Sequence, residues 1–245
     1  MSRWTHPAFA GLAVLTLIRL GIAAAVPLVP DEAYYWVWSR ALAPGYLDHP
    51  PMVALWIRAG TALAGATSLG VRLFGPLSAA IGTLLLYDAA ERLFPGRRAG
   101  LTAAMLLNAT LMFGAGSVLM TPDTPLLFFW TAALWSAARI AAGGAAGWWL
   151  AAGAFAGLAL DSKYTAAFLP LGFAAYVLIA SPGWLRRREI WLGAVAGLLL
   201  FAPVVAWNFA HDWAGFLRQG GRVADWRPAA RPRRVGRRGH RARRR

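Results

Sequence analysis

The sequence predicts an all-α polytopic membrane protein. Hydrophobic residues make up 58% of the 245 residues and charged residues only 14%, whereas a soluble globular domain carries roughly 25% charged residues. Apolar stretches long enough to cross a bilayer recur along the chain, and the charged residues fall mainly in the segments between them. Together these features argue against a soluble domain.

Seven apolar stretches are predicted to be membrane spans, each near the roughly 20 residues that a crossing helix needs. The first is interrupted by Arg19, and its basic flank at Arg3 leaves a signal peptide as an alternative, although its length and the spans that follow favour a span. The fifth is short. The seven are Ala8–Val29, Leu73–Tyr87, Ala99–Met120, Thr124–Ala142, Trp148–Leu160, Thr165–Ala180 and Ile190–Phe209.

The charges between these spans predict the orientation, because short cytoplasmic loops are enriched in arginine and lysine. Arginines follow the second and sixth spans and lie near the end of the fourth, whereas six of the ten acids fall on the opposite side, which we expect to face outward. Counting residues 52–67 as another crossing would reverse the later loops. We therefore expect an interfacial helix there, with Trp56 at headgroup level. The arginines are Arg92, Arg97, Arg98, Arg139 and Arg186 to Arg188, and the acids are Asp31, Glu32, Asp48, Asp123, Asp161 and Asp212.

The net charge of +15 is concentrated at the end of the chain. Residues 227–245 contain ten arginines and no acid, whereas residues 1–226 contain fifteen basic and ten acidic residues. This places a transmembrane domain at 1–226, with an outer-face loop at 30–70, and an arginine-rich tail at 227–245. The tail would emerge on the outer side, against the positive-inside tendency, so we expect it to be disordered or translated out of frame. A basic arm that binds anionic lipid or nucleic acid is the alternative.

Several classes of protein are excluded by what the sequence lacks. The absence of cysteine excludes disulfide scaffolds, zinc fingers and thiolate nucleophiles. The only lysine, Lys163, follows no P-loop motif, and HExxH and GxSxG are also absent. No nucleotide cofactor is therefore expected.

Four outer segments carry residues that could perform chemistry. The richest, PDEAYYWVWSRALAPGYLDHPPM, places Asp31 and Glu32 directly after the first span. Adjacent carboxylates point in different directions, so at most one would act as a base. A structural interpretation is an aromatic belt with solvated acids. The remaining candidates in this segment are Tyr34, Tyr35, Asp48 and His49.

The other three segments have simpler structural interpretations. Asp123, in TPDTP, could cap the helix that follows it. Lys163, in DSKY, could pair with Asp161 or lie at headgroup level. Arg218 and Arg222 follow the last span in WNFAHDWAGFLRQGGR, where they would suit a phosphate or simply lie at the interface.

Taken together, DEAYYWVWS, DHPP, TPDTPLLFFW, SKYTA and WN..HDW..F..Q resemble, in order and spacing, bacterial membrane glycosyltransferases of family 39 and the protein-mannosyltransferase-like group, related to the aminoarabinose transferases. The resemblance covers residues 18–226. It implies a GT-C-type transmembrane helix bundle, of which this chain matches the N-terminal portion, with the active site on the outer face. It also implies a polyprenyl-phosphate sugar donor and inversion of the anomeric centre.

The resemblance also assigns roles to individual residues. Asp31 stands at the family's catalytic aspartate, with Glu32 beside it, and Asp123 at its second acidic position. His49 stands where the aminoarabinose transferases have a lysine before two prolines, which puts the contact to the carrier phosphate in doubt. Family members are commonly longer than this chain.

The residues permit a mechanism in which Asp31 takes the proton of the attacking acceptor hydroxyl. Cations would stabilise the departing polyprenyl phosphate, and the candidates are His49, Arg72, Lys163 and Arg218. The partners implied are the bilayer, a polyprenyl-phosphate sugar donor and an acceptor that the sequence does not identify; no nucleic acid is expected. The sequence leaves open whether a divalent metal takes part. A transporter or lipid flippase is the alternative function, although such proteins tend to place ionisable groups near the membrane midplane.

Overall fold

A computed structural model describes residues 5–224, and within them all regular structure is helical. The predicted tail at 227–245 lies outside the described residues. The elements run α1 (Thr5–Ala25), α2 (Pro30–Arg40), α3 (Met52–Ala64), α4 (Ser68–Arg72), α5 (Phe74–Leu93), α6 (Ala99–Ala109), α7 (Leu111–Gly114), η1 (Gly116–Val118), α8 (Asp123–Ala141), α9 (Trp148–Leu160), η2 (Tyr164–Ala167), α10 (Phe168–Ala180), η3 (Pro182–Arg186), α11 (Arg188–Ala210) and α12 (Ala214–Ala224).

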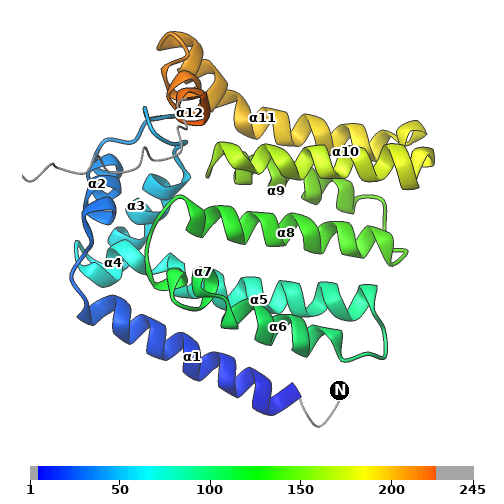
Figure 1. Cartoon of the computed structure of the whole chain (residues 1–245), viewed down its shortest axis with the longest axis horizontal. Coiled ribbons are helices and arrows are strands. Elements are labelled where there is room, and N and C mark those ends of the chain that lie inside the picture. The colour runs from blue at the N-terminus through cyan, green and yellow to red at the C-terminus, as the bar shows by residue number, and fades with distance from the viewer. Residues whose placement is uncertain (1–4, 225–245) are drawn as a thin grey trace, which may run out of the picture.

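The long helices lie side by side and α2, α3 and α4 cover one end of them (Figure 1). The turns that join α5 to α6, α8 to α9 and α10 to α11 all lie at the opposite end (Figure 1). The arginines lie in or beside these turns. The acid-bearing segments lie at the other end, which α2 to α4 cover: α2 and α8 begin there, and α9 and α11 end there. The sequence therefore predicted correctly that the two kinds of connecting segment lie at opposite ends.

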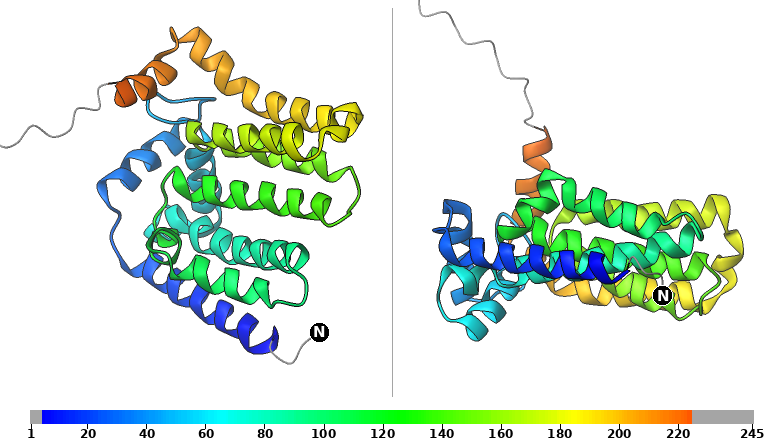
Figure 2. Two further views of the ribbon diagram at one scale, coloured as in Figure 1. Left: turned by 45° about the vertical axis from the view of Figure 1, so that its right-hand side comes forward. Right: turned by 90° about the horizontal axis from the view of Figure 1, so that it is seen from below.

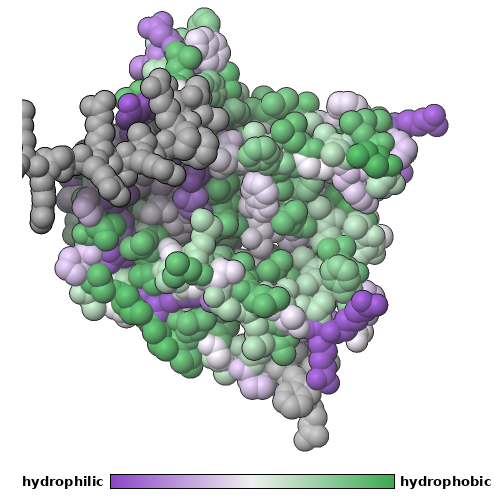
Figure 3. All heavy atoms as spheres, viewed as in Figure 1, coloured by the Kyte–Doolittle hydropathy of each residue, from purple (hydrophilic) through white to green (hydrophobic). Residues whose placement is uncertain are grey.

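Each of the seven predicted stretches overlaps one helix or two to three consecutive helices. Within residues 5–224, three helices are by themselves long and apolar enough to cross a membrane: Pro7–Ala25, Ser68–Leu93 and Arg188–Ala210. The face seen in Figure 3 is mostly apolar over the long helices, with hydrophilic side chains gathered toward the ends. An apolar outer surface of this kind suits a chain surrounded by lipid.

The third predicted stretch, Ala99–Met120, is not one straight helix. It breaks between α6 and α7, and the two parts meet at 78°. Thr110 begins the new direction, because its side chain accepts a hydrogen bond from the backbone N–H of Phe113 at 3.3 Å. The side chain of Asn108 is held by Thr83 of α5, which fixes the last turn of α6. An apolar pattern does not distinguish a straight span from a broken one.

The predicted outer-face loop at 30–70 is largely helical. Pro30 occupies the first helical position of α2, and two acids follow in its first turn, where a fixed φ and the helix dipole favour these residues. The predicted helix at 52–67 is present as α3, but Trp56 packs against Phe74, Phe128 and Phe129. The α2 to α4 segment is therefore an integral part of the bundle.

The close packing of α9 on α11 depends on glycine. A Cβ atom at Gly153 would lie 1.9 Å from the carbonyl oxygen of Gly193, and one at Gly157 would lie 2.5 Å from that of Gly197. Small residues spaced four apart let two helix backbones approach each other in a membrane. This contact fixes the position of α11 and hence of α12, which turns away from it (Figure 2).

Candidate functional site

Asp31 and Glu32 begin α2, and their side chains have different surroundings. Successive residues of an α-helix are about 100° apart around its axis, so only one of the two can face the body of the protein. Glu32 is fully buried, whereas Asp31 is exposed. Asp31 is therefore the one of the two whose carboxylate a substrate can reach.

Glu32 forms a buried ion pair with Arg72. Its Oε1 accepts a hydrogen bond from Arg72 Nε at 2.7 Å, and its Oε2 accepts one from Arg72 Nη2 at 2.5 Å. The backbone N–H groups of Val29 and Met120 donate to the same two oxygens. Glu32 thus ties the start of α2 to α4 and to the segment before α8.

This geometry gives structural roles to Arg72, which was predicted to contact the carrier phosphate, and to Glu32, which was named as a candidate beside Asp31. Arg72 is fully buried and donates its remaining hydrogen bonds to the backbone carbonyls of Ala23, Val26 and Pro27. It is therefore a structural residue that holds the end of α1, and it has no donor directed at a carrier phosphate. Glu32 is likewise unsuited to act as a catalytic base, because both of its oxygens are occupied by donors.

Asp123 pairs with the only lysine. Lys163 Nζ lies 2.8 Å from Asp123 Oδ1 and 2.9 Å from Oδ2, and both side chains remain partly exposed. Of the two alternatives for Lys163, pairing with Asp161 is wrong, because the lysine pairs with Asp123 while Asp161 is buried at the end of α9. Asp123 occupies the first turn of α8, but no side-chain hydrogen bond caps that helix.

Asp48 joins the α2–α3 connection to α12. Its Oδ2 accepts a hydrogen bond from the Tyr34 hydroxyl at 2.9 Å, and its Oδ1 forms an ion pair with Arg218 Nε at 3.1 Å. The side chain of Gln219 donates to the Asp48 carbonyl. Arg218 is 52% exposed, so a ligand at this end could still reach it.

The pKa of Tyr35 is affected by acids from three different segments. Burial, followed by the negative charges of Asp31, Asp48 and Asp123, raises the pKa of Tyr35 to about 12. Three carboxylates from separate segments therefore act on one buried phenol. The ring of Tyr35 also meets that of His49 edge-on, with 6.1 Å between the ring centroids.

Three residues at this end were not among the predicted site residues. Tyr46 stacks on Trp38 with 4.3 Å between ring centroids, and its hydroxyl donates to the Trp38 carbonyl. Asn208 is fully buried and holds the start of α12, because its Oδ1 accepts from the Phe216 N–H at 3.1 Å. Burial raises the pKa of Asp161 to about 7. The motif WN..HDW contains Asn208, but sequence alone does not show its contacts.

Residues 5–224 contain no group of three or more His, Asp or Glu side chains placed to hold a metal ion.

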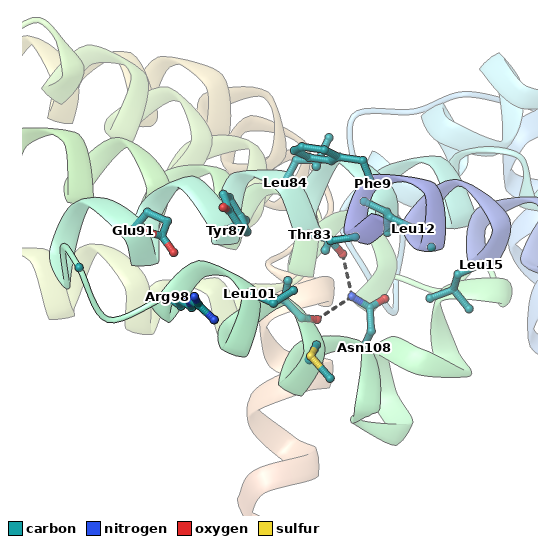
Figure 4. A pocket seen from close by; sticks show the side chains of 15 residues that line it. Phe9, Leu12, Leu15, Thr83, Leu84, Tyr87, Glu91, Arg98, Leu101 and Asn108 are labelled. Carbon is teal, nitrogen blue, oxygen red and sulfur yellow. Dashed lines mark hydrogen bonds between the residues drawn. The ribbon is translucent and has the colours of Figure 1, made fainter. Parts of the chain in front are cut away.

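A separate cavity of about 710 Å³ lies between α1, α5 and α6. Its apolar walls lead to the Asn108–Thr83 hydrogen bond at one end and to Glu91 and Arg98 at the other (Figure 4). None of the predicted site residues lines it, so it is distinct from the acidic end.

Residues 48–207 match the family model of the dolichyl-phosphate-mannose-protein mannosyltransferases. A lipid A galacturonosyltransferase, RgtD of Rhizobium johnstonii, is 32% identical over 183 residues, which are 74% of this chain and 38% of RgtD. An undecaprenyl phosphate-alpha-4-amino-4-deoxy-L-arabinose arabinosyl transferase of Pseudomonas aeruginosa is 31% identical over 227 residues, covering 80% of this chain and 40% of the relative. The chain thus spans about two fifths of the length of these relatives.

Solved structures share the fold. ArnT from Cupriavidus metallidurans bound to undecaprenyl phosphate superposes with a TM-score of 0.69 at 24% identity, over 87% of this chain and 43% of that one. The Pmt1–Pmt2 complex of S. cerevisiae, bound to its sugar donor, gives 0.59 at 18% identity, over 87% and 35%. These matches confirm the predicted GT-C-type membrane fold. The relatives are named as transferases, so the transporter alternative receives no support from them.

Proposed function

Because the chain belongs to the dolichyl-phosphate-mannose-protein mannosyltransferase family, we propose that its acidic end is the reaction site of a membrane glycosyltransferase. The enzyme would transfer a sugar from a polyprenyl-phosphate carrier to a lipid, glycan or protein acceptor on the outer face of the bacterial cytoplasmic membrane. The name of RgtD favours a lipid of the cell envelope as acceptor.

One observation carries this proposal. Asp31 lies in the first turn of α2, Asp48 in the α2–α3 connection and Asp123 at the start of α8, so all three acids lie at the end of the bundle away from the arginine-bearing turns, where Lys163 pairs with Asp123. A site for a lipid-linked donor belongs at such an end, because the lipid tail stays in the bilayer while the sugar and phosphate reach water. The opposite, arginine-rich end would face the cytoplasm.

Asp31 is the proposed general base. As the acceptor oxygen attacks the anomeric carbon, its proton passes to the Asp31 carboxylate. The bond between that carbon and the phosphate oxygen breaks, and its electron pair leaves with the polyprenyl phosphate. Attack from the opposite face inverts the anomeric centre.

The cations of this end would stabilise the phosphate as it leaves. Lys163 is held in place by Asp123, and Arg218 is held by Asp48 while half of its side chain stays exposed. Charges positioned before the reaction lower the barrier without reorganisation during it. His49, on the same segment as Asp48, is the third candidate.

The test compares two Asp-to-Asn variants at the same end of the molecule. Membranes that contain the chain are incubated with polyprenyl-phosphate-linked sugars, and the release of polyprenyl phosphate is measured. Asp31→Asn should lower the release rate by about 10²- to 10⁴-fold, the usual contribution of a general base.

Asp212→Asn is the matched control. Asp212 is exposed in the turn between α11 and α12 and has a φ of 53°, a conformation that asparagine also adopts readily. Its replacement should leave the rate unchanged. Undiminished release by Asp31→Asn would refute the assignment of the base.

A further inference from the structure

A second cavity, of about 370 Å³, lies beside Asp123 between α5, α7 and α8. Its lining includes the apolar side chains of Leu111, Met112 and Phe128 and the polar side chains of Ser117 and Asp123. The cavity therefore offers both apolar and polar contacts, which suits an amphiphilic ligand.

The apolar part lies where the span formed by α6 and α7 breaks. Leu111 is 83% exposed and Met112 is 58% exposed, so in a bilayer both side chains contact lipid. The break itself is held from inside, because Arg19 of α1 donates to the Gly114 carbonyl through Nε at 3.2 Å and Nη2 at 3.0 Å. The broken span thus gives the cavity a side that faces the membrane.

The polar part contains a hydroxyl that lacks a partner. Ser117 is 6% exposed, and its Oγ is buried without a hydrogen-bond partner in the described structure. Leaving a buried hydroxyl unpaired costs free energy, so a ligand that supplies a hydroxyl here would remove that cost. The Asp123 carboxylate also lines the cavity and, although it pairs with Lys163, its side chain is 34% exposed, so it can accept a further hydrogen bond from a ligand hydroxyl.

The charge of the lining decides which ligand fits. Among the described residues that line the cavity, Asp123 is the one charged side chain, and none is cationic. Lys163 pairs with Asp123 from outside this lining, so a phosphate inside the cavity would meet the carboxylate and no lining cation, whereas a neutral sugar hydroxyl would meet hydrogen-bond acceptors.

We propose that this cavity receives the glycosyl acceptor, a neutral, hydroxyl-bearing amphiphile that enters sideways from the bilayer past α7. Its apolar part lies against Leu111, Met112 and Phe128, and its hydroxyl groups lie toward Ser117 and Asp123. The carrier phosphate binds elsewhere, beside the cations. The inference rests on the proposed function and identifies the acceptor as an alcohol rather than a phosphate.

The experiment measures binding and not turnover. The purified chain in phosphatidylcholine nanodiscs is irradiated with either of two probes that share one diazirine-bearing alkyl chain, a glucoside and a phosphate monoester. Mass spectrometry then locates the labelled residues. The glucoside should label residues 111–113 and 127–128 about tenfold more than the phosphate does, a preference of roughly 1.4 kcal/mol.

A matched pair of variants tests the location. Ser117→Leu fills the polar part and should lower labelling of these residues by about tenfold. Ser181→Leu, which makes the same change beyond α10 at the arginine-bearing end, should leave it unchanged. If Ser117→Leu does not fold, Met112→Trp at the exposed mouth should give the same loss.

A third arm distinguishes acceptor from donor. Preloading with undecaprenyl phosphate should leave the glucoside labelling intact, since the two ligands occupy different places. Displacement would instead mean that the glucoside occupies the donor's place and would overturn the acceptor assignment.

Three other results would also overturn the proposal. They are equal labelling by the two probes, labelling spread over α10 and α11, and labelling that neither cavity variant changes. None of them affects the Asp31→Asn release assay, so failure here is distinguishable from failure of the proposed function.

Discussion

Replacing Glu32 by Gln should destabilise the protein more than any exposed ion pair could. Both partners of the Glu32–Arg72 pair are 0% exposed. The Glu32 carboxylate receives four hydrogen bonds, from Arg72 Nε and Nη2 and from the backbone N–H groups of Val29 and Met120. Glutamine removes the charge and presents an NH₂ group to one pair of these donors.

The expected loss in the free energy of unfolding follows from the Arg72 charge, which Glu32→Gln leaves buried and unpaired. Removing one partner of a buried pair leaves an uncompensated buried charge, which costs about 3–5 kcal/mol. The matched control is Glu189→Gln, whose pair with Arg187 has side chains 24% and 57% exposed. Exposed pairs contribute about 0–1 kcal/mol, so the two variants should differ by several kcal/mol.

The assay is unfolding of the purified chain in mixed micelles by increasing SDS, followed by far-ultraviolet circular dichroism. A double variant, Glu32→Gln with Arg72→Met, should cost less than the sum of the two single costs, because neither charge is then left alone. A loss for Glu32→Gln of less than about 1 kcal/mol, equal to that of the control, would refute a buried ion pair as the tie between α2, α4 and α8.

Two further changes test the structure at other places. Burial raises the pKa of Asp161 from 3.8 to about 7, so between these pH values the folded chain holds a proton that the unfolded chain has released. Stability should therefore fall as pH rises through this window, by up to about 1.4 kcal/mol per pH unit; Asp161→Asn should remove this slope in pH-dependent SDS unfolding, and equal slopes would contradict the assignment. Gly153→Ala would place a Cβ 1.9 Å from the Gly193 carbonyl oxygen and should cost about 1–3 kcal/mol as overpacking. Gly172→Ala is the control, because a Cβ at Gly172 would meet nothing within 4 Å. The midpoint of thermal unfolding is measured for both variants, and equal midpoints would argue against close α9–α11 packing.

The sequence predicted the fold class and the sidedness of the connecting segments because both depend on local composition. Apolar length marks a helix wherever it packs, and α9 was predicted to span Trp148–Leu160, as found. The broken span was missed because its apolar pattern continues through the break. What marks the break is local: Thr110 turns its side chain to its own backbone, and this becomes evident only with the geometry in hand.

The site was predictable in composition but not in pairing. Asp31, Asp48 and Asp123 were predicted to lie at one end, and the start of α2, the α2–α3 connection and the start of α8 do lie at the same end of the bundle. The sequence did not show that Glu32 would form an ion pair with Arg72, 40 residues away. It also did not show that Lys163 would pair with Asp123 instead of Asp161. Which of two adjacent acids turns inward depends on the helix that begins at Pro30, and the sequence pattern alone indicated a loop there.

The two buried arginines, Arg19 and Arg72, explain how irregular backbone can exist inside a lipid-facing bundle. Backbone carbonyls that leave a helix inside an apolar region need a donor, because lipid supplies none. Arg72 donates to the carbonyls at the end of α1, and Arg19 donates to those at the end of α7. A guanidinium group suits this position, since it offers five donors in a fixed plane and complements the negative end of a helix.

These two arginines therefore have a role different from that of the cations proposed to contact phosphate. Arg72 holds the segment that presents Asp31, and Arg19 holds the break that borders the cavity beside Asp123. Lys163 and Arg218 keep part of their side chains exposed and pair with acids that are themselves partly exposed. Burial thus separates the cations that maintain the shape of the site from those that remain accessible to a charged ligand.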